Sequence, residues 1–137
     1  MNIKICISAE KSHRFYLKAR REYEKRLSRY CKLSVKEIKS TEKPGKALEG
    51  AAVAIVIDET GKQLSSERLA QEIAAAELGG ISRAAVVIGV PVPEDFPGEI
   101  KRVAVSRMEL SADLLGVVVL EQIYRAYKII HGETYHK

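Results

Sequence analysis

The chain of 137 residues lacks most of the motifs from which an activity is usually inferred. It has no tryptophan and only two cysteines, Cys6 and Cys31, which show neither a CxxC arrangement nor metal-site spacing. It also has no GxGxxG, P-loop, zinc or EF-hand pattern, and no Ser/His/Asp arrangement is visible. We therefore expect two reduced thiols, at least one of them buried, and no metal ion.

Long apolar runs and a targeting segment are missing as well. Residues 1–7 form a short apolar alternation with no basic region before it, unlike a signal peptide. The longest fully apolar run is far shorter than the roughly 20 residues that a membrane span needs. No repeat, low-complexity segment or linker interrupts the chain. We expect a cytoplasmic protein that does not contact a membrane, with one domain over residues 1–137.

The charge balance is mildly basic. There are 23 Lys and Arg against 18 Asp and Glu, a net charge of +5, which favours a polyanionic partner such as RNA without demonstrating one. Basic side chains repeat at helical spacing near the N-terminus, at Arg14, Lys18, Arg21 and Lys25. An RNA contact and a solvated face balanced by Glu22 and Glu24 explain this ridge about equally well.

Apolar periodicity predicts strands that alternate with helices. Continuous apolar runs predict strands buried on both faces at residues 51–57 and 84–88. Weaker patterns predict strands at residues 3–7, 33–38 and 103–105, a turn at 58–62 and a short helix at 97–102. Helices are expected at residues 13–29, from Ser65 or Ser66 to Gly79, and from a cap at Asp113 to Gly132. This alternation indicates an α/β fold with a parallel sheet covered on both faces.

Two regions attract attention as a site. In open parallel sheets, ligands bind at the carboxyl ends of strands. Here the loops that follow Ile57, Ile88 and Val105 would meet if these strands are neighbours. The second region is the polar tail after Gly132, which ends in an aromatic ring, an imidazole and an amine. From chemistry alone, a disordered end is the simpler reading of that tail.

The stretch of residues 120–137 closely resembles the C-terminus of the H-type large-subunit ribosomal RNA methyltransferases. Residues 22–27, 58–67 and 69–72 resemble that family's first helix and its middle segment. These are small α/β-knot (SPOUT) enzymes that methylate N3 of a pseudouridine in 23S ribosomal RNA. The resemblance implies a C-terminal trefoil knot, S-adenosylmethionine as cofactor, and the large ribosomal subunit or the 70S ribosome as partner. It also implies a homodimer that packs through the last helix.

The resemblance implies functional roles for particular residues. By position, the cofactor-binding residues are Ile57, Gly89, Val105, Ser106, Arg107, Met108, Glu109 and Leu110. The catalytic residues are those of the tail, Tyr135, His136 and Lys137. Tyr135 is expected to stack on the base and Lys137 to bind phosphate, whereas His136 either relays the proton or positions the base.

Three positions differ from the family's pattern. Residues 89–93, Gly-Val-Pro-Val-Pro, replace a Gly-Gly-x-x-Gly loop, Ser111-Ala112 replaces Pro-His, and Gly116 replaces an arginine. These differences favour an alternative, a catalytically inactive knot protein that binds RNA or pairs as a heterodimer with a methyltransferase. The retained Tyr-His-Lys tail favours the active enzyme.

Overall fold

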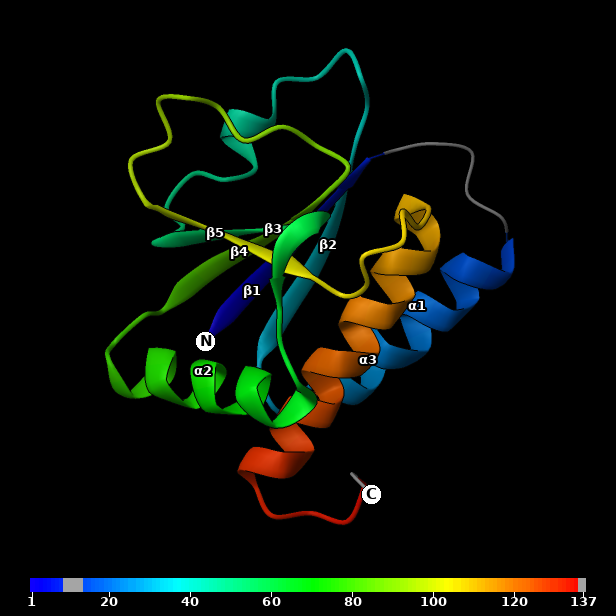
Figure 1. Cartoon of the computed structure of the whole chain (residues 1–137), viewed down its shortest axis with the longest axis vertical. Coiled ribbons are helices and arrows are strands. Elements are labelled where there is room, and N and C mark those ends of the chain that lie inside the picture. The colour runs from blue at the N-terminus through cyan, green and yellow to red at the C-terminus, as the bar shows by residue number, and fades with distance from the viewer. Residues whose placement is uncertain (9–13, 136–137) are drawn as a thin grey trace.

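The computed structural model describes residues 1–8 and 14–135 and consists of a parallel sheet with three helices (Figure 1). The strands are β1 (Asn2–Ser8), β2 (Lys32–Ile38), β3 (Val53–Gln63), β4 (Arg83–Ile88) and β5 (Glu99–Ala104). They pair in the order β2-β1-β4-β3-β5, and every pairing is parallel. The helices are α1 (Arg14–Leu27), α2 (Ser66–Leu78) and α3 (Ala112–Ile130), and η1 (Pro44–Lys46) is a 3-10 turn. The predicted α/β class is confirmed.

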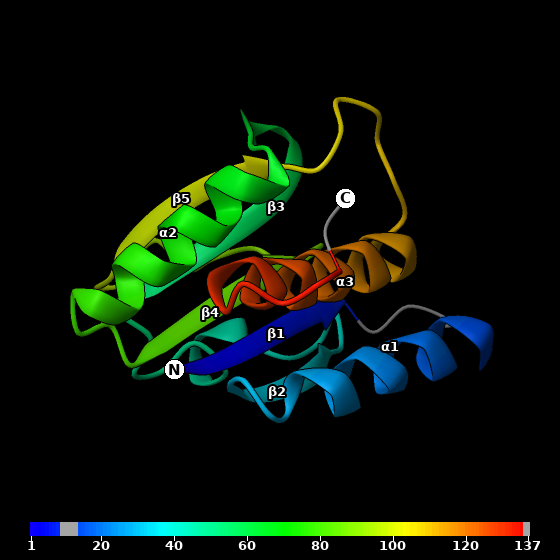
Figure 2. The same ribbon diagram turned by 90° about the horizontal axis from the view of Figure 1, so that it is seen from below.

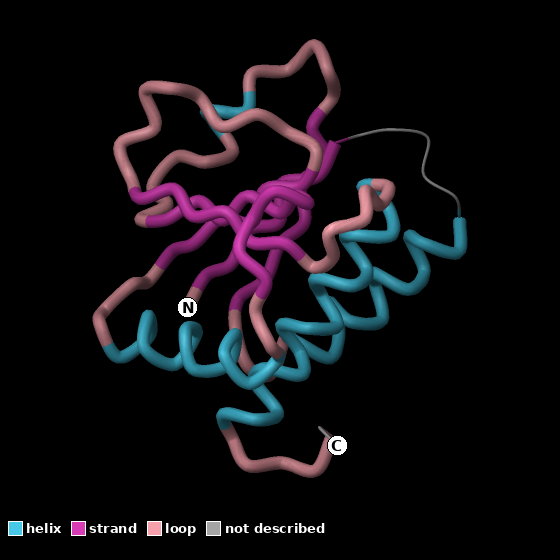
Figure 3. Tube along the Cα trace, in the orientation of Figure 1, coloured by secondary structure: helices cyan, strands magenta, loops and turns pink. Residues whose placement is uncertain are grey.

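All three helices lie on one face of the sheet (Figure 2). The main core forms there, where alternate side chains of β1 and β4 meet Leu27 of α1 and Leu120 and Tyr127 of α3. A second, smaller core covers the opposite face. In it Cys6, Ala54 and Val87 pack against residues of the loops at 39–52 and 89–98, which lie away from the helices (Figure 3). Both faces are therefore covered, but the second face is covered by loops.

Strand β3 continues through the segment predicted to be a turn, so the prediction of a turn at residues 58–62 was wrong. Ile57 and Lys62 both pair with Val103, which makes the intervening residues a bulge. The Asp58 carboxylate accepts hydrogen bonds from the Thr60 hydroxyl and N–H and forms an ion pair with Arg102 at 2.7 Å. The Thr60 hydrogen bonds and then Arg102 lower the pKa of Asp58. At Gly61 an added Cβ would lie 2.5 Å from the Val103 nitrogen, so only glycine fits.

Two further expectations are corrected. Residues 97–102 do not form a helix, because Glu99–Ala104 is the edge strand β5, paired with β3. Helix α3 begins after Ser111, whose Oγ accepts a hydrogen bond from the Leu114 N–H, so Asp113 lies in the first turn and is not the cap. The start of α2 and the end of α3 agree with the sequence, since Ser65 caps α2 and Gly132 has a φ of +65° after α3. Helix α1 ends at Leu27, two residues before the predicted end, and its predicted start at residue 13 lies outside the described residues.

The two cysteines are free and both are buried, as the sequence predicted for at least one of them. Burial raises the pKa of the Cys31 thiol to about 11, so this thiol remains protonated at neutral pH. Among the described residues, no helix has the length and apolarity that crossing a membrane requires.

Candidate functional site

The loops predicted to meet do lie at one edge of the sheet. Strand β3 lies between β4 and β5, and Ile57 pairs with Ile88 on one side and with Val103 on the other. Gly89 follows Ile88 directly, and residues 105–110 follow β5. The strand ends that bear the predicted cofactor-binding residues are thus adjacent at the carboxyl edge, which is the usual position for a ligand in an open parallel sheet.

Gly89 has a backbone conformation that other residues rarely adopt. Its φ is +70°, and an added Cβ would lie 2.7 Å from the Ser8 Oγ and 3.6 Å from the Ala112 Cβ. The Ser8 hydroxyl is buried and has no hydrogen-bond partner among the described residues. The end of β1, the loop after β4 and the start of α3 therefore meet closely at Gly89, and a buried polar atom lies beside it.

The residues after β5 form an open loop at the same edge. Ser106 Oγ accepts a hydrogen bond from the Met108 N–H at 3.0 Å. The Met108 side chain is 75% exposed, and Arg107 and Glu109 are exposed as well. Such a loop offers backbone groups and an apolar side chain to a ligand without needing charged partners.

A cavity of about 350 Å³ extends from this edge beneath α2. The sheet contributes Ile57 to its lining, the loop after β5 contributes Val105, α2 contributes Leu69, and α3 contributes Val119 and Gln122. Its lining is mainly apolar, and its volume lies within the roughly 300–1,000 Å³ typical of small-molecule sites. Of the predicted cofactor-binding residues, Ile57 and Val105 line the cavity, whereas Gly89 and residues 106–110 do not. The cavity fits an apolar part of a cofactor, and the loops at the edge offer backbone groups to a polar part.

The three departures from the family's pattern have a packing explanation. Val90 is buried in the second core, and no described residue other than glycine has a positive φ, so the valine does not strain the loop. Ser111 caps α3. At Gly116 an added Cβ would lie 2.9 Å from the Ile7 Cδ1 and 3.5 Å from the Arg20 Cδ, so Arg20 occupies the neighbouring space.

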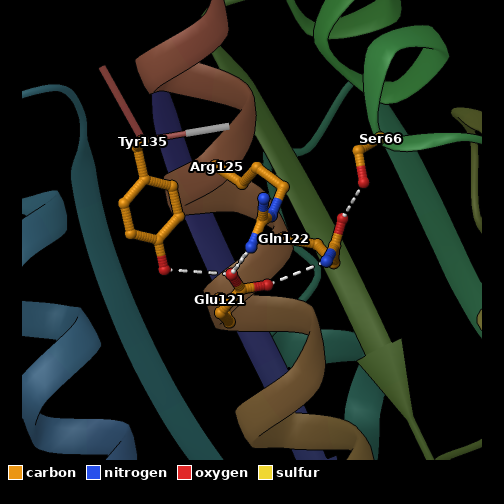
Figure 4. Close-up of polar contacts among 5 residues, drawn as sticks. All are labelled: Ser66, Glu121, Gln122, Arg125 and Tyr135. Atoms are coloured by element: carbon orange, nitrogen blue, oxygen red, sulfur yellow. Dashed lines mark hydrogen bonds and ion pairs between the residues drawn. The ribbon is translucent and has the colours of Figure 1, made fainter. Parts of the chain in front are cut away.

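Tyr135 is folded back onto α3, with its hydroxyl pointing at Glu121 (Figure 4). Its hydroxyl donates a hydrogen bond to Glu121 Oε1 at 3.0 Å, and Arg125 binds the same oxygen at 2.9 Å. The Arg125 guanidinium also lies 4.9 Å from the centre of the Tyr135 ring. Glu121 is nine residues beyond Ala112, about 14 Å along the helix at 1.5 Å per residue. His136 and Lys137 lie outside the described residues.

The tail is held by a polar network that reaches α2. Gln122 donates a hydrogen bond to Glu121 Oε2 at 2.8 Å and accepts one from the Ser66 hydroxyl at 2.6 Å (Figure 4). Nothing in the sequence marked Ser8 or Glu121 as a site residue, and Arg125 was expected at most to bind phosphate. The spacing of four residues between Glu121 and Arg125 is the available signal for an ion pair, but it does not show that the tail binds there.

Burial and then the hydrogen bond to Glu121 raise the pKa of Tyr135 to about 12. The docked tail therefore favours the protonated phenol, so docking contributes stability below about pH 10 and loses it as the pH rises towards 12. At pH 11 an ordinary tyrosine is about 90% ionised, whereas Tyr135 should be about 10% ionised. The difference in tyrosinate absorbance between wild type and Tyr135→Phe measures this, and a step centred at pH 10 would contradict it.

Removing the shared acceptor should release the tail. Glu121→Ala deletes the partner of both Tyr135 and Arg125, and we expect a loss of about 1–3 kcal/mol of stability. Carboxypeptidase should then remove the C-terminal residues several-fold faster, as followed by mass spectrometry. Glu22→Ala, which breaks the exposed helical pair with Arg26, is the control. Equal digestion rates in both variants would show that Glu121 does not hold the tail.

Among the described residues, no three His, Cys, Asp or Glu side chains are grouped so that they could hold a metal ion.

A family model described as "Predicted SPOUT methyltransferase" matches residues 1–136. The chain belongs to the SPOUT methyltransferase family. These enzymes use S-adenosylmethionine, and the family resemblance inferred from the sequence is confirmed.

Relatives of this SPOUT methyltransferase align over its full length and over theirs. The protein named ribosomal RNA large subunit methyltransferase H 1 from Thermoanaerobacter sp. (strain X514) is 38% identical over 137 positions, covering 100% of both chains. Proteins named ribosomal RNA large subunit methyltransferase H from Clostridium novyi and Bifidobacterium adolescentis are each 36% identical, over 159 and 160 positions. The Thermoanaerobacter alignment has as many positions as this chain has residues.

Proposed function

We propose that this protein methylates N3 of a pseudouridine in 23S ribosomal RNA with S-adenosylmethionine as methyl donor. The proposal depends mainly on one observation, the end-to-end match to relatives named ribosomal RNA large subunit methyltransferase H. The geometry of the carboxyl edge supports it, because Gly89 and the loop after β5 follow neighbouring strands there, and a cavity of cofactor size beneath α2 reaches Ile57 and Val105. An enzyme that modifies ribosomes would work in the cytoplasm.

When bound, S-adenosylmethionine supplies an electrophilic methyl group and its own leaving group, so the chain needs no metal. Backbone groups of Ile57, Gly89 and residues 105–110 would bind and orient the cofactor. The target nitrogen must lose a proton as the bond to the methyl carbon forms. His136 would accept that proton or position the base, and Tyr135 would stack on the base.

We propose further that two copies pack through α3. Leu114 and Ile130 on this helix are 36% exposed in the single chain, as apolar interface residues would be. The Tyr135 hydroxyl binds Glu121, which lies about 14 Å along α3 from Ala112 at the helix start. If two α3 helices pair antiparallel, a tail that acts in catalysis would act at the carboxyl edge of the second copy. Light scattering should give the mass of two chains, and the mass of one would contradict the dimer.

The trefoil knot of the superfamily belongs to the same proposal. The order β4-β3-β5 supports it, because the chain must cross β3 between β4 and β5. An experimental trace through residues 89–111 tests it, since an unthreaded trace would contradict the knot.

Methyl transfer from labelled S-adenosylmethionine to 70S ribosomes tests the activity. We expect label in the large-subunit RNA, at one pseudouridine located by mass spectrometry of nuclease fragments. Ribosomes already methylated at that base serve as the control and should accept none. Absence of label with an otherwise active preparation of ribosomes would favour the alternative, a non-catalytic RNA-binding protein or heterodimer partner.

A further inference from the structure

Positive charge is concentrated in one continuous segment of the chain. Residues 14–46 hold 12 Lys and Arg against 4 Asp and Glu, a net charge of +8, whereas the other 104 residues hold 11 against 14. The segment builds α1, the edge strand β2 and the loop that follows it. Residues 53–104, which build β3, α2, β4 and β5, hold 5 Lys and Arg against 8 Asp and Glu. Because β2 and β5 are the two ends of the sheet, the charges lie at opposite edges.

The basic edge presents its charges to solvent. The α1 ridge consists of Arg14, Lys18, Arg21 and Lys25, all of which are exposed. Neighbouring members are three or four residues apart, about 4.5–6 Å along the helix. On the edge strand β2, Lys32 and Lys36 are exposed, and Lys36 lies 3.9 Å from the Glu42 carboxylate. The result is a basic surface that extends from a helix to the adjacent strand.

Acidic neighbours do not neutralise this ridge. Glu22 is bound to Arg26 at 3.0 Å, and Glu37 is bound to the buried Arg20 at 2.8 Å. Within the described residues, no ion pair is formed by Lys18, Arg21 or Lys25. A solvated face balanced by internal pairs is therefore a poor description of α1, because the available carboxylates are largely engaged elsewhere.

The ridge also starts at the carboxyl edge of the sheet. Helix α1 follows the carboxyl end of β1, where Ser8 lies beside Gly89, and runs away from that edge. A groove of about 380 Å³ between α1 and β2 follows the ridge, but its lining includes Glu24 and Glu37. Phosphates are accordingly expected on the ridge and not inside the groove.

We propose that the α1 ridge together with Lys32 and Lys36 is the surface that docks ribosomal RNA through its phosphates. The inference rests on the proposed function and assigns its substrate contact to one edge of the molecule. Contacts from Lys and Arg to phosphates supply affinity without reading sequence, and they release counterions. RNA held along the ridge would enter the carboxyl edge at the end where α1 begins.

Binding to 70S ribosomes at several salt concentrations tests the proposal. The double variant Arg21→Gln, Lys25→Gln removes two charges from exposed positions. The plot of log affinity against log salt has a negative slope, and we expect it to become shallower by about 1.4–1.8. Affinity for ribosomes near 0.15 M salt should fall roughly tenfold or more. Arg68→Gln, Arg83→Gln removes the same charge from exposed positions on α2 and β4, away from the ridge, and should change neither. Affinity for S-adenosylmethionine should be unchanged in both variants.

Each other outcome overturns the inference in a recognisable way. Equal losses in the two variants would mean that only net charge matters. Unchanged ribosome binding by the ridge variant, with wild-type methylation intact, would refute this docking surface and leave the proposed function standing. A changed oligomeric mass in the ridge variant, with ribosome affinity retained, would make the ridge a protein interface. Failure of the wild type both to bind and to methylate ribosomes would remove the function and the docking surface together.

Discussion

Deleting residues 135–137 is expected to reduce methylation of 70S ribosomes by about a hundredfold or more, because positioning and proton transfer typically contribute factors of that size. The deletion removes the phenol that binds Glu121 and the ring that contacts Tyr124 and Arg125. The sheet and α3 do not depend on these contacts, so the shortened chain should still fold and bind S-adenosylmethionine.

Tyr135→Phe separates the contribution of the Tyr135 hydroxyl from that of the rest of the tail. It keeps the ring against Tyr124, with centroids 5.0 Å apart, and removes only the hydrogen bond to Glu121. We expect a much smaller loss of activity than in the deletion. Methylation at the wild-type rate by the shortened chain would show that the tail has no catalytic role.

Replacing Gly89 with alanine should have the second large effect. At a φ of +70° the alanine pays a backbone cost of about 1–2 kcal/mol, and its Cβ would press on the Ser8 Oγ at 2.7 Å. Relief of that contact has to rotate or shift the Ser8 side chain at the end of β1, or shift the loop that would bind the cofactor. We expect affinity for S-adenosylmethionine to fall at least tenfold, as measured by calorimetric titration.

Gly80→Ala is the matched control for this substitution. Gly80 has a φ of +83°, and an added Cβ would meet nothing within 4 Å. Its backbone cost should resemble that at Gly89, and it follows α2 at the opposite end of the sheet from the carboxyl edge. Equal losses of cofactor affinity in the two variants would mean that Gly89 acts through stability alone.

The buried strands could be predicted from the sequence because their apolar runs are sufficient to identify them. Residues 51–57 and 84–88 have no polar side chains, and the strands found there, which begin at Val53 and Arg83, lie inside the sheet. Strand β5 could not be predicted in full, because Glu99, Lys101 and Arg102 interrupt the alternation of apolar and polar side chains that indicates a strand. These residues are exposed because β5 is an edge strand. Its backbone pairing with β3 decides the structure there. The bulge after Ile57 likewise depends on a contact with Val103 that is distant in sequence.

The candidate site could be predicted only in part. The resemblance indicated Ile57, Gly89 and the loop after β5, and the strand order brings their strand ends together. Ser8 has no distinguishing signal, since a serine that ends a strand is ordinary. The position of Tyr135 on α3 depends on Glu121 and on the path of the chain after Gly132, which no local pattern specifies.

Calorimetric titration of the full chain with S-adenosylmethionine tests the central claim most directly, because every proposed step requires the cofactor at the carboxyl edge. We expect one binding site per chain, with an affinity that Gly89→Ala lowers and Gly80→Ala preserves. No detectable binding by the folded wild-type protein would contradict the assignment of this edge as a methyl-donor site.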